Sequence, residues 1–179
     1  MKIAMTGTHS TGKTTLVEAL RTEPQFKDYF FDVNVTRWVN SLGFPINTST
    51  SDASQEVNMI ARVAHLNSFD NIIADRSITD VLAYTAAGEE ISERSLQKIK
   101  KLWLANIHKY DYIFYLKPEF DSVDDGTRAP SEDVHYRNEI DFLIGDFFSY
   151  AKEHYGVKIH PISGSVRQRV EQVLKITGI

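Results

Sequence analysis

The sequence contains no cysteine among its 179 residues. This excludes disulfide bridges, thiolate metal sites and a cysteine nucleophile, so any metal ion must bind oxygen or imidazole ligands. The chain also lacks an apolar run long enough to cross a bilayer, and the run at residues 3–5 is too short for the core of a signal peptide. These absences predict a cytoplasmic protein that binds no membrane.

Positive charge is not in excess either. The chain has 20 Lys and Arg against 24 Asp and Glu, which leaves a formal net charge of −4. This balance argues against wholesale binding of nucleic acid, although it is compatible with a local basic groove. With 42% hydrophobic and 25% charged residues and no internal repeat, we expect one globular domain over residues 1–179.

Apolar runs predict β-strands that are buried on both faces, at residues 3–5, 29–35, 72–74, 112–116 and 157–162. Segments with helical spacing lie between them, and the clearest begins after Pro130 and continues to Tyr155. Strands that alternate with helices predict an α/β fold, with a five-stranded parallel sheet and helices on both of its faces. Residues 118–130 are acidic and carry few apolar side chains, which predicts a mobile loop.

The segment GTHSTGKT at residues 7–14 fits the phosphate-loop pattern GxxxxGK[ST] at every fixed position. It follows a predicted strand and opens a predicted helix, which is the context that the pattern requires. The glycines let backbone N–H groups surround phosphate oxygens, Lys13 adds positive charge, and Thr14 offers a hydroxyl to magnesium. We assign His9 no role. The predicted phosphate-binding residues are Gly7, Ser10, Thr11, Gly12, Lys13, Thr14 and Thr15.

The predicted strand at residues 72–74 is followed by Asp75 and Arg76. The carboxyl ends of parallel strands meet at one edge of the sheet, so both side chains are expected beside the phosphate loop. Asp75 then holds magnesium or accepts a proton from an attacking hydroxyl; the alternative is that it caps the next helix, as Ser77 also can. Arg76 suits an anionic substrate, and a surface salt bridge is its alternative.

Residues 75–84 resemble the DRSxxDxxAY signature of small P-loop nucleoside and nucleotide kinases. This group includes thymidylate kinases, deoxynucleoside kinases, the ribosylnicotinamide kinase domain and an AAA-type domain that resembles the last. The resemblance covers nearly the whole chain. It implies a P-loop NTPase fold that uses ATP and Mg²⁺.

The sequence DGTR at residues 125–128 is followed by YR at residues 136–137 and ID at residues 140–141. This spacing resembles the ribosylnicotinamide-kinase-like members of the group. By this likeness residues 119–131 form a short lid, and Arg128 and Arg137 bind phosphates. The helical spacing agrees for Arg137, which lies beside the apolar stripe of its helix and is expected to lean inward. Asp141, one turn on, is expected to pair with it and orient it; the alternative is a simple intrahelical ion pair.

The chain departs from this family at residues 34–37. Where relatives often carry a glutamate in an ExxR element, this sequence has Asn34, which cannot act as a general base. Asp32 or Asp75 then takes the proton, or the acceptor is already anionic and needs little deprotonation. The likeness assigns Arg37 to the phosphate or sugar of the acceptor.

Further substrate contacts are predicted from position and residue type. Gln55 is a candidate for recognising the edge of a base, and Tyr84 for stacking on it, although an aromatic side chain at helical spacing is more often core. Relatives place adenine against the loop after the fifth strand, which here contains Gly164, Ser165 and Arg167. The alternative for that loop is an ordinary turn with a serine cap.

These features predict an ATP- and Mg²⁺-dependent kinase that transfers the γ-phosphoryl group to a small nucleoside or nucleoside monophosphate. The expected catalytic residues are Lys13, Asp75, Arg128 and Arg137, and Thr14 and Asp75 are the expected metal ligands. Two alternatives stay open: a regulatory ATPase or nucleotide-binding switch, and a kinase that acts on a polynucleotide. A missing NKxD element argues against a GTPase, and the sequence allows a monomer or a homodimer.

Overall fold

A computed structural model describes residues 1–45, 50–118 and 130–179, which are the described residues throughout. Arg128 and nearly all of the predicted lid at 119–131 lie outside them. Among the described residues, no helix combines the length and the apolar character that a membrane span requires.

The sheet has five parallel strands in the order β2-β3-β1-β4-β5. They are β1 (Lys2–Thr6), β2 (Phe30–Asp32), β3 (Ile72–Asp75), β4 (Tyr112–Leu116) and β5 (Ile159–Ile162). The predicted α/β class and the five predicted strands are confirmed. β2 ends at Asp32 rather than at residue 35, because the backbone turns at Asn34, where φ is 63°, and a helix begins at Val35.

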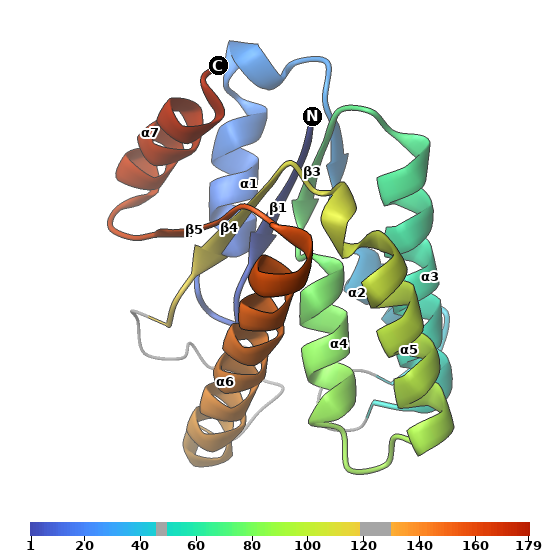
Figure 1. Ribbon diagram of the computed structural model, residues 1–179. Coiled ribbons are helices and arrows are strands. Elements are labelled where there is room, and N and C mark those ends of the chain that lie inside the picture. Colours follow the sequence, from blue (N-terminus) through green and yellow to red (C-terminus); the bar gives the residue numbers. More distant parts are fainter. Residues whose placement is uncertain (46–49, 119–129) are drawn as a thin grey trace.

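Helices cover both faces of the sheet (Figure 1). α1 (Lys13–Arg21) and α7 (Val166–Thr177) pack on one face. α3 (Asp52–Ser68), α4 (Ile78–Ala86), α5 (Glu93–Asn106) and α6 (Pro130–Tyr155) pack on the other. The short helix α2 (Val35–Ser41) contacts α3. The segments η1 (Pro24–Phe26) and η3 (Ile107–Lys109) are short 3-10 helices.

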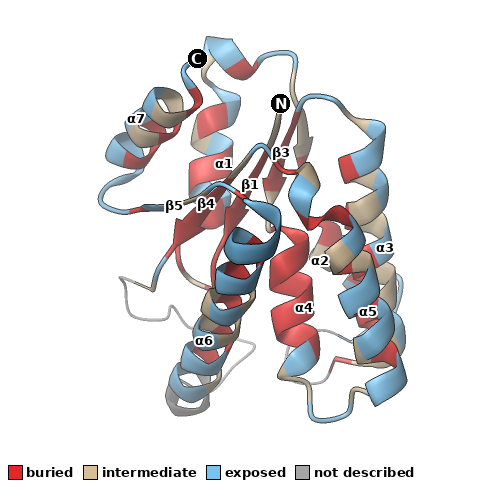
Figure 2. Ribbon diagram, in the orientation of Figure 1, coloured by how far each residue is buried: buried red, intermediate tan, exposed pale blue. Residues whose placement is uncertain are grey.

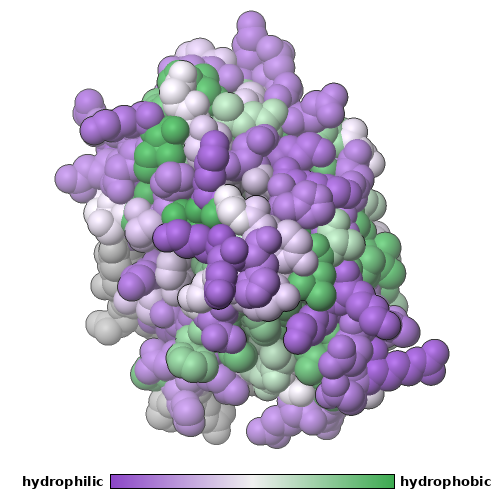
Figure 3. Space-filling view, viewed as in Figure 1, coloured by the Kyte–Doolittle hydropathy of each residue, from purple (hydrophilic) through white to green (hydrophobic). Residues whose placement is uncertain are grey.

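The strands are buried on both faces, which explains their uninterrupted apolar sequences. Ile3 and Met5 of β1 face the core under α1 and α7, whereas Ala4 between them faces the core under α4, α5 and α6. Figure 2 shows that α4 is buried along most of its length, while α5, α6 and α7 expose their outer sides. On the molecular face in Figure 3, hydrophilic side chains predominate and apolar ones form small separate groups.

The central position of β1 brings the loop after it between the ends of two neighbouring strands. Met5 is in register with Asp75 of β3 and with Phe114 of β4. The loop then passes so close to β4 that a Cβ atom added to Gly7 would lie 2.3 Å from the backbone oxygen of Leu116. Glycine is therefore required at the start of this loop.

We expect Gly7→Ala to lower the free energy of unfolding by about 1–3 kcal/mol, because the new Cβ meets a backbone atom and φ is 153°. Gly145→Ala is the matched control. A Cβ at this position inside α6 meets nothing within 4 Å, so this change should stabilise the protein by about 0.5–1 kcal/mol. Urea unfolding measures the free energy of unfolding of both variants. Changes of the same sign in the two variants would contradict the close packing at Gly7.

Candidate functional site

The phosphate-loop sequence forms a tight turn between β1 and α1. Ser10 and Gly12 have left-handed φ angles of 57° and 83°, and Gly12 is the N-cap of α1. The first N–H groups of a helix have no partners within it, so this end of α1 offers donors to an anion. Thr11 is fully buried, whereas Thr14 and Thr15 are exposed at the mouth of the turn.

Lys13 lies inside this turn and is only 5% exposed. Its Nζ donates to the backbone oxygen of Thr8 and to Oγ1 of Thr11, the latter at 3.1 Å. Burial, and after it repulsion from Arg76, lower the pKa of this amine from 10.5 to about 7. Phosphate oxygens that enter the loop would restore the charge of Lys13.

Asp75 and Thr14 form the part of the site that suits a metal ion. Thr14 Oγ1 donates to Asp75 Oδ2 at 2.6 Å, so the two side chains share one position at the edge of the sheet. Within the described ranges, no cluster of three or more His, Asp or Glu side chains can hold a metal by itself. A hydroxyl and a single carboxylate fit Mg²⁺ that is bound together with substrate phosphates.

Asp80 is a buried carboxylate to which the sequence analysis assigned no role. It is 1% exposed and accepts hydrogen bonds from the N–H groups of Gly7 (3.3 Å) and Ser77 (2.8 Å). Ser77 and Asp80 form a capping box at the N-terminus of α4, so Ser77 rather than Asp75 is the cap. Asp80 thus ties the phosphate loop to α4. The spacing S-x-x-D after a strand end was the signal for it.

Arg76 lies between the phosphate loop and the neighbouring pocket. Its φ of 93° is unusual for a residue with a side chain. The guanidinium forms an ion pair with Asp80, with Nη1 3.6 Å from Oδ1, and lies 5.1 Å from the ring centroid of Tyr84. The Tyr84 hydroxyl is 3.3 Å from Nδ1 of His9, a contact that the sequence did not indicate.

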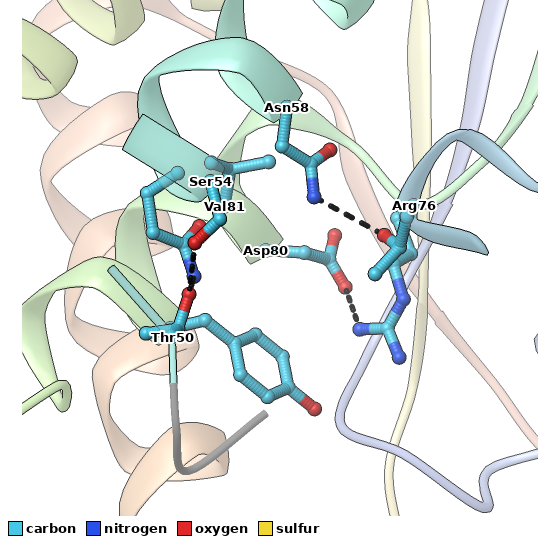
Figure 4. Close-up of a pocket in the computed structure, with 9 residues that line it drawn as sticks. Thr50, Ser54, Asn58, Arg76, Asp80 and Val81 are labelled. Atoms are coloured by element: carbon cyan, nitrogen blue, oxygen red, sulfur yellow. Dashed lines mark hydrogen bonds and ion pairs between the residues drawn. The ribbon is translucent and has the colours of Figure 1, made fainter. Parts of the chain in front are cut away.

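A pocket of about 430 Å³, counting its open mouth, adjoins Arg76 (Figure 4). It is lined by Thr36, Thr50, Ser54, Gln55, Asn58, Arg76, Asp80, Val81 and Tyr84. Most of these side chains are polar and uncharged. The predicted substrate contacts Gln55, Arg76 and Tyr84 therefore meet in one pocket, but Arg37 is exposed on α2, donates to Asn34 at 3.4 Å, and does not line it.

Hydrogen bonds fix the orientation of the Gln55 amide. Ser54 Oγ donates to the backbone oxygen of Ser51 at 2.8 Å, so it must accept from Thr50 Oγ1, which is also 2.8 Å away. Thr50 Oγ1 in turn accepts from Gln55 Nε2 at 2.8 Å. Gln55 Oε1 is left buried without a hydrogen-bond partner among the described residues. The pocket therefore offers an acceptor to an N–H group of a ligand.

Arg137 extends inward from α6 and is 5% exposed. Its Nε and Nη2 atoms are buried and have no hydrogen-bond partner in the described part of the chain, and its charge helps to lower the pKa of Lys13. The expected pairing with Asp141 is not formed, because Asp141 Oδ1 accepts from the hydroxyl of Tyr115, on β4, at 2.6 Å. Arg137 therefore keeps donors for an anion near Lys13.

The predicted adenine-binding residues give a mixed result. Gly164 lies in the turn after β5 with φ 94°, and Ser165 caps α7. Arg167 is 90% exposed and pairs with Glu171 on the surface, so the structure does not bring it to the nucleotide side. Arg169 lies there instead: it is 3% exposed and donates to the backbone oxygen of Thr11 at 2.7 Å. Its place on the apolar stripe of α7 was the overlooked signal.

Comparison with known proteins agrees with this architecture. The sequence model of an AAA-domain family matches residues 2–169, and no curated protein matches the sequence. A solved structure of deoxyadenosine kinase from M. mycoides is 15% identical, with a TM-score of 0.67, and the match covers 99% of this chain and 98% of that chain.

Two other solved structures have the same fold. Thymidylate kinase from Ehrlichia chaffeensis is 19% identical, with a TM-score of 0.63, over 99% of this chain and 98% of that one. NadR protein in complex with NR is 18% identical, with a TM-score of 0.72, over 99% of this chain but only 51% of that one. The fold of small P-loop kinases, predicted from the motifs, is thus confirmed.

We expect ADP, bound at pH 8 without divalent metal, to take up nearly one proton, because Lys13 is mostly neutral above its pKa of about 7 and phosphate recharges it. At pH 6 Lys13 is already protonated, so the uptake should vanish. Calorimetry in two buffers of different ionisation enthalpy measures the proton count. Lys13→Arg, which stays charged at both pH values, should show no uptake. A wild-type count that is the same at pH 6 and pH 8 would refute the lowered pKa.

Proposed function

This chain belongs to the AAA-domain family whose model spans residues 2–169, and we propose that it is a kinase of a small nucleoside or nucleoside monophosphate, with ATP and Mg²⁺ as cofactors. The observation that carries the proposal is a polar pocket beside the phosphate loop, with Arg76 and Asp80 common to both. A simple ATPase needs the loop but not the pocket. Two structural neighbours are, by name, a deoxyadenosine kinase and a thymidylate kinase, which supports the same reading.

The phosphate loop is the donor half of the proposed site. Its backbone N–H groups and Lys13 bind the β- and γ-phosphates of ATP. Thr14 and Asp75 are the side chains that would hold Mg²⁺, which would neutralise charge on the phosphates. Arg137 places free N–H donors near Lys13, where they stabilise the charge of the γ-phosphoryl group during transfer.

The pocket is the acceptor half of the proposed site. A base whose N–H group meets Gln55 Oε1 satisfies the buried acceptor that the protein leaves unpaired. Asn58 Nδ2 donates to Thr36 Oγ1 at 3.2 Å and keeps a second N–H for the ligand. Arg76, at the end nearest the phosphate loop, faces the sugar oxygen or the phosphate of the acceptor. Catalysis then follows mainly from positioning and charge neutralisation.

The choice of proton acceptor is narrowed by existing contacts. Asp32 is 2% exposed and is bonded to Arg62 and His65, outside the pocket lining. Both oxygens of Asp80 already accept N–H or O–H donors. Of these three carboxylates, Asp75 is thus the one that can receive a proton. An anionic acceptor, such as a nucleoside monophosphate, needs no base and leaves Asp75 to the metal.

Purified protein with ATP and Mg²⁺ is expected to phosphorylate at least one member of a panel of nucleosides and nucleoside monophosphates, with products identified by mass. Asp75→Asn should lower kcat by about 10- to 100-fold. Added Mn²⁺ should restore part of that loss if Asp75 serves the metal, and none of it if Asp75 is the base.

Steady ATP hydrolysis that no small acceptor changes would contradict the kinase proposal and favour a regulatory ATPase. Transfer only to added single-stranded or duplex DNA would favour a polynucleotide kinase. Lys13→Met, which removes the charge in the phosphate loop, serves as the inactive control for contaminating kinases.

Arg137→Met should change activity and stability in opposite directions. We expect kcat to fall by about 100-fold or more, because a donor to the transferring group is lost. The free energy of unfolding should rise by about 1 kcal/mol, since a buried charge without partners is replaced by an apolar side chain. Kinetics and urea unfolding measure the two effects. Arg94→Met, at an exposed position on α5, should change neither, and a loss of stability in Arg137→Met would show a structural role.

A further inference from the structure

One buried guanidinium that the proposed mechanism does not use connects the end of β3 to the wall of the pocket. Arg62, on α3, is 2% exposed. Its Nη1 donates to the backbone oxygens of Asp75 and Arg76, both at 3.1 Å. These carbonyls flank the turn at which Arg76 has a φ of 93°. Arg62 therefore holds the backbone that carries the proposed metal ligand.

The two carbonyls need this donor because the neighbouring strand stops short of them. β2 ends at Asp32, which is in register with Ala74, so β2 provides no N–H group beside Asp75. A buried carbonyl without a partner costs about as much free energy as a lost hydrogen bond. Arg62 takes the place of the missing strand and leaves the Asp75 side chain directed toward Thr14.

The other side of the same guanidinium holds the pocket. Nε donates to Asn58 Oδ1 at 2.9 Å, and Nη2 lies 3.4 Å from Thr36 Oγ1; both partners line the pocket. Asp32 neutralises the charge, with Oδ2 3.6 Å from Nη1. A planar group with donors on both edges is required for this geometry, and the ammonium of lysine cannot reach all of these acceptors.

We propose that Arg62 is a positioning residue that aligns Asp75 with the metal position and, through Asn58 and Thr36, with the acceptor pocket. The role of Arg62 at the acceptor pocket rests on the proposed function. Its role in aligning Asp75 with the metal position concerns nucleotide binding alone. It predicts that Mg²⁺ strengthens ADP binding through a carboxylate whose backbone Arg62 fixes. Side chains that support ligands in this way commonly contribute 10- to 100-fold to metal affinity or activity.

The test compares ADP binding with and without Mg²⁺ by calorimetry, in the wild type and in Arg62→Lys. We expect the affinity without metal to change by less than about 2-fold, because the hydrogen bonds of Arg62 do not reach the phosphate loop. The strengthening by Mg²⁺ should fall by about 10-fold or more. An unchanged strengthening would overturn the proposal. So would a loss of metal-free affinity as large as the loss with Mg²⁺.

Two further variants separate positioning from general destabilisation. Leu66→Ala, one turn along α3 in the core, should lower the melting temperature while the Mg²⁺ effect stays intact; loss of that effect here would overturn the proposal. Asp32→Asn keeps the shape of the side chain beside Arg62 but removes the counter-charge of the guanidinium. It should therefore weaken the Mg²⁺ effect on ADP binding, by less than Arg62→Lys does. This variant also keeps the proposal testable if Arg62→Lys fails to fold. An unchanged Mg²⁺ effect in Asp32→Asn would count against the proposal.

The acceptor assay distinguishes a failure of this inference from a failure of the proposed function. If the wild type phosphorylates an acceptor, Arg62→Lys should lower kcat and raise the KM of the acceptor more than the KM of ATP. If the wild type phosphorylates nothing in the panel, the kinase proposal falls, and the calorimetric comparison still decides whether Arg62 positions Asp75.

Discussion

Burial of several positively charged groups around one small volume is the constraint on which this site depends. Arg76 and Arg137 both lie within electrostatic range of Lys13, and Asp80 is a buried carboxylate beside them. Burial, and after it repulsion from Arg76, lowers the pKa of Lys13 to about 7, and donors of Arg137 are left without partners among the described residues. Such an arrangement destabilises the fold, and a bound polyphosphate relieves it, so the same charges favour ligand binding at the expense of stability.

Residues far away in the sequence maintain the unusual backbone of the site. Gly7 passes against the last carbonyl of β4, so the phosphate loop takes its path from the sheet. Arg76 keeps its left-handed φ while Arg62 of α3 binds the carbonyls on both sides and Asp80 of α4 pairs with its side chain. A strained conformation persists only where neighbours determine it from several directions. The geometry of this site is therefore a property of the packed sheet and helices rather than of the loop alone.

Local patterns predicted the fold and the phosphate loop, because strand burial, helix period and the glycine spacing are visible in short windows. The meeting of Asp75 with Thr14 was also predictable, since parallel strands end at one edge. Contacts between side chains of elements that lie far apart in the sequence were not predictable in this way. Asp141 bonds to Tyr115 instead of Arg137, because a residue of β4 competes for it. Likewise Arg167 and Arg169 have the same chemistry, and only the packing of α7 on α1 decides which one turns inward.

The departure at Asn34 and the position of Arg62 have a common physical cause. Asn34 adopts a left-handed φ of 63°, a conformation that asparagine tolerates better than glutamate does. This turn ends β2 at Asp32 and starts α2, which leaves the carbonyls after Ala74 without a strand partner and opens the space that Arg62 fills. Arg62 in turn needs Asp32 as its counter-charge. The turn that places asparagine rather than glutamate at position 34 thus also commits Asp32 to an ion pair with Arg62, and under the proposed function this leaves Asp75 rather than Asp32 to receive a proton.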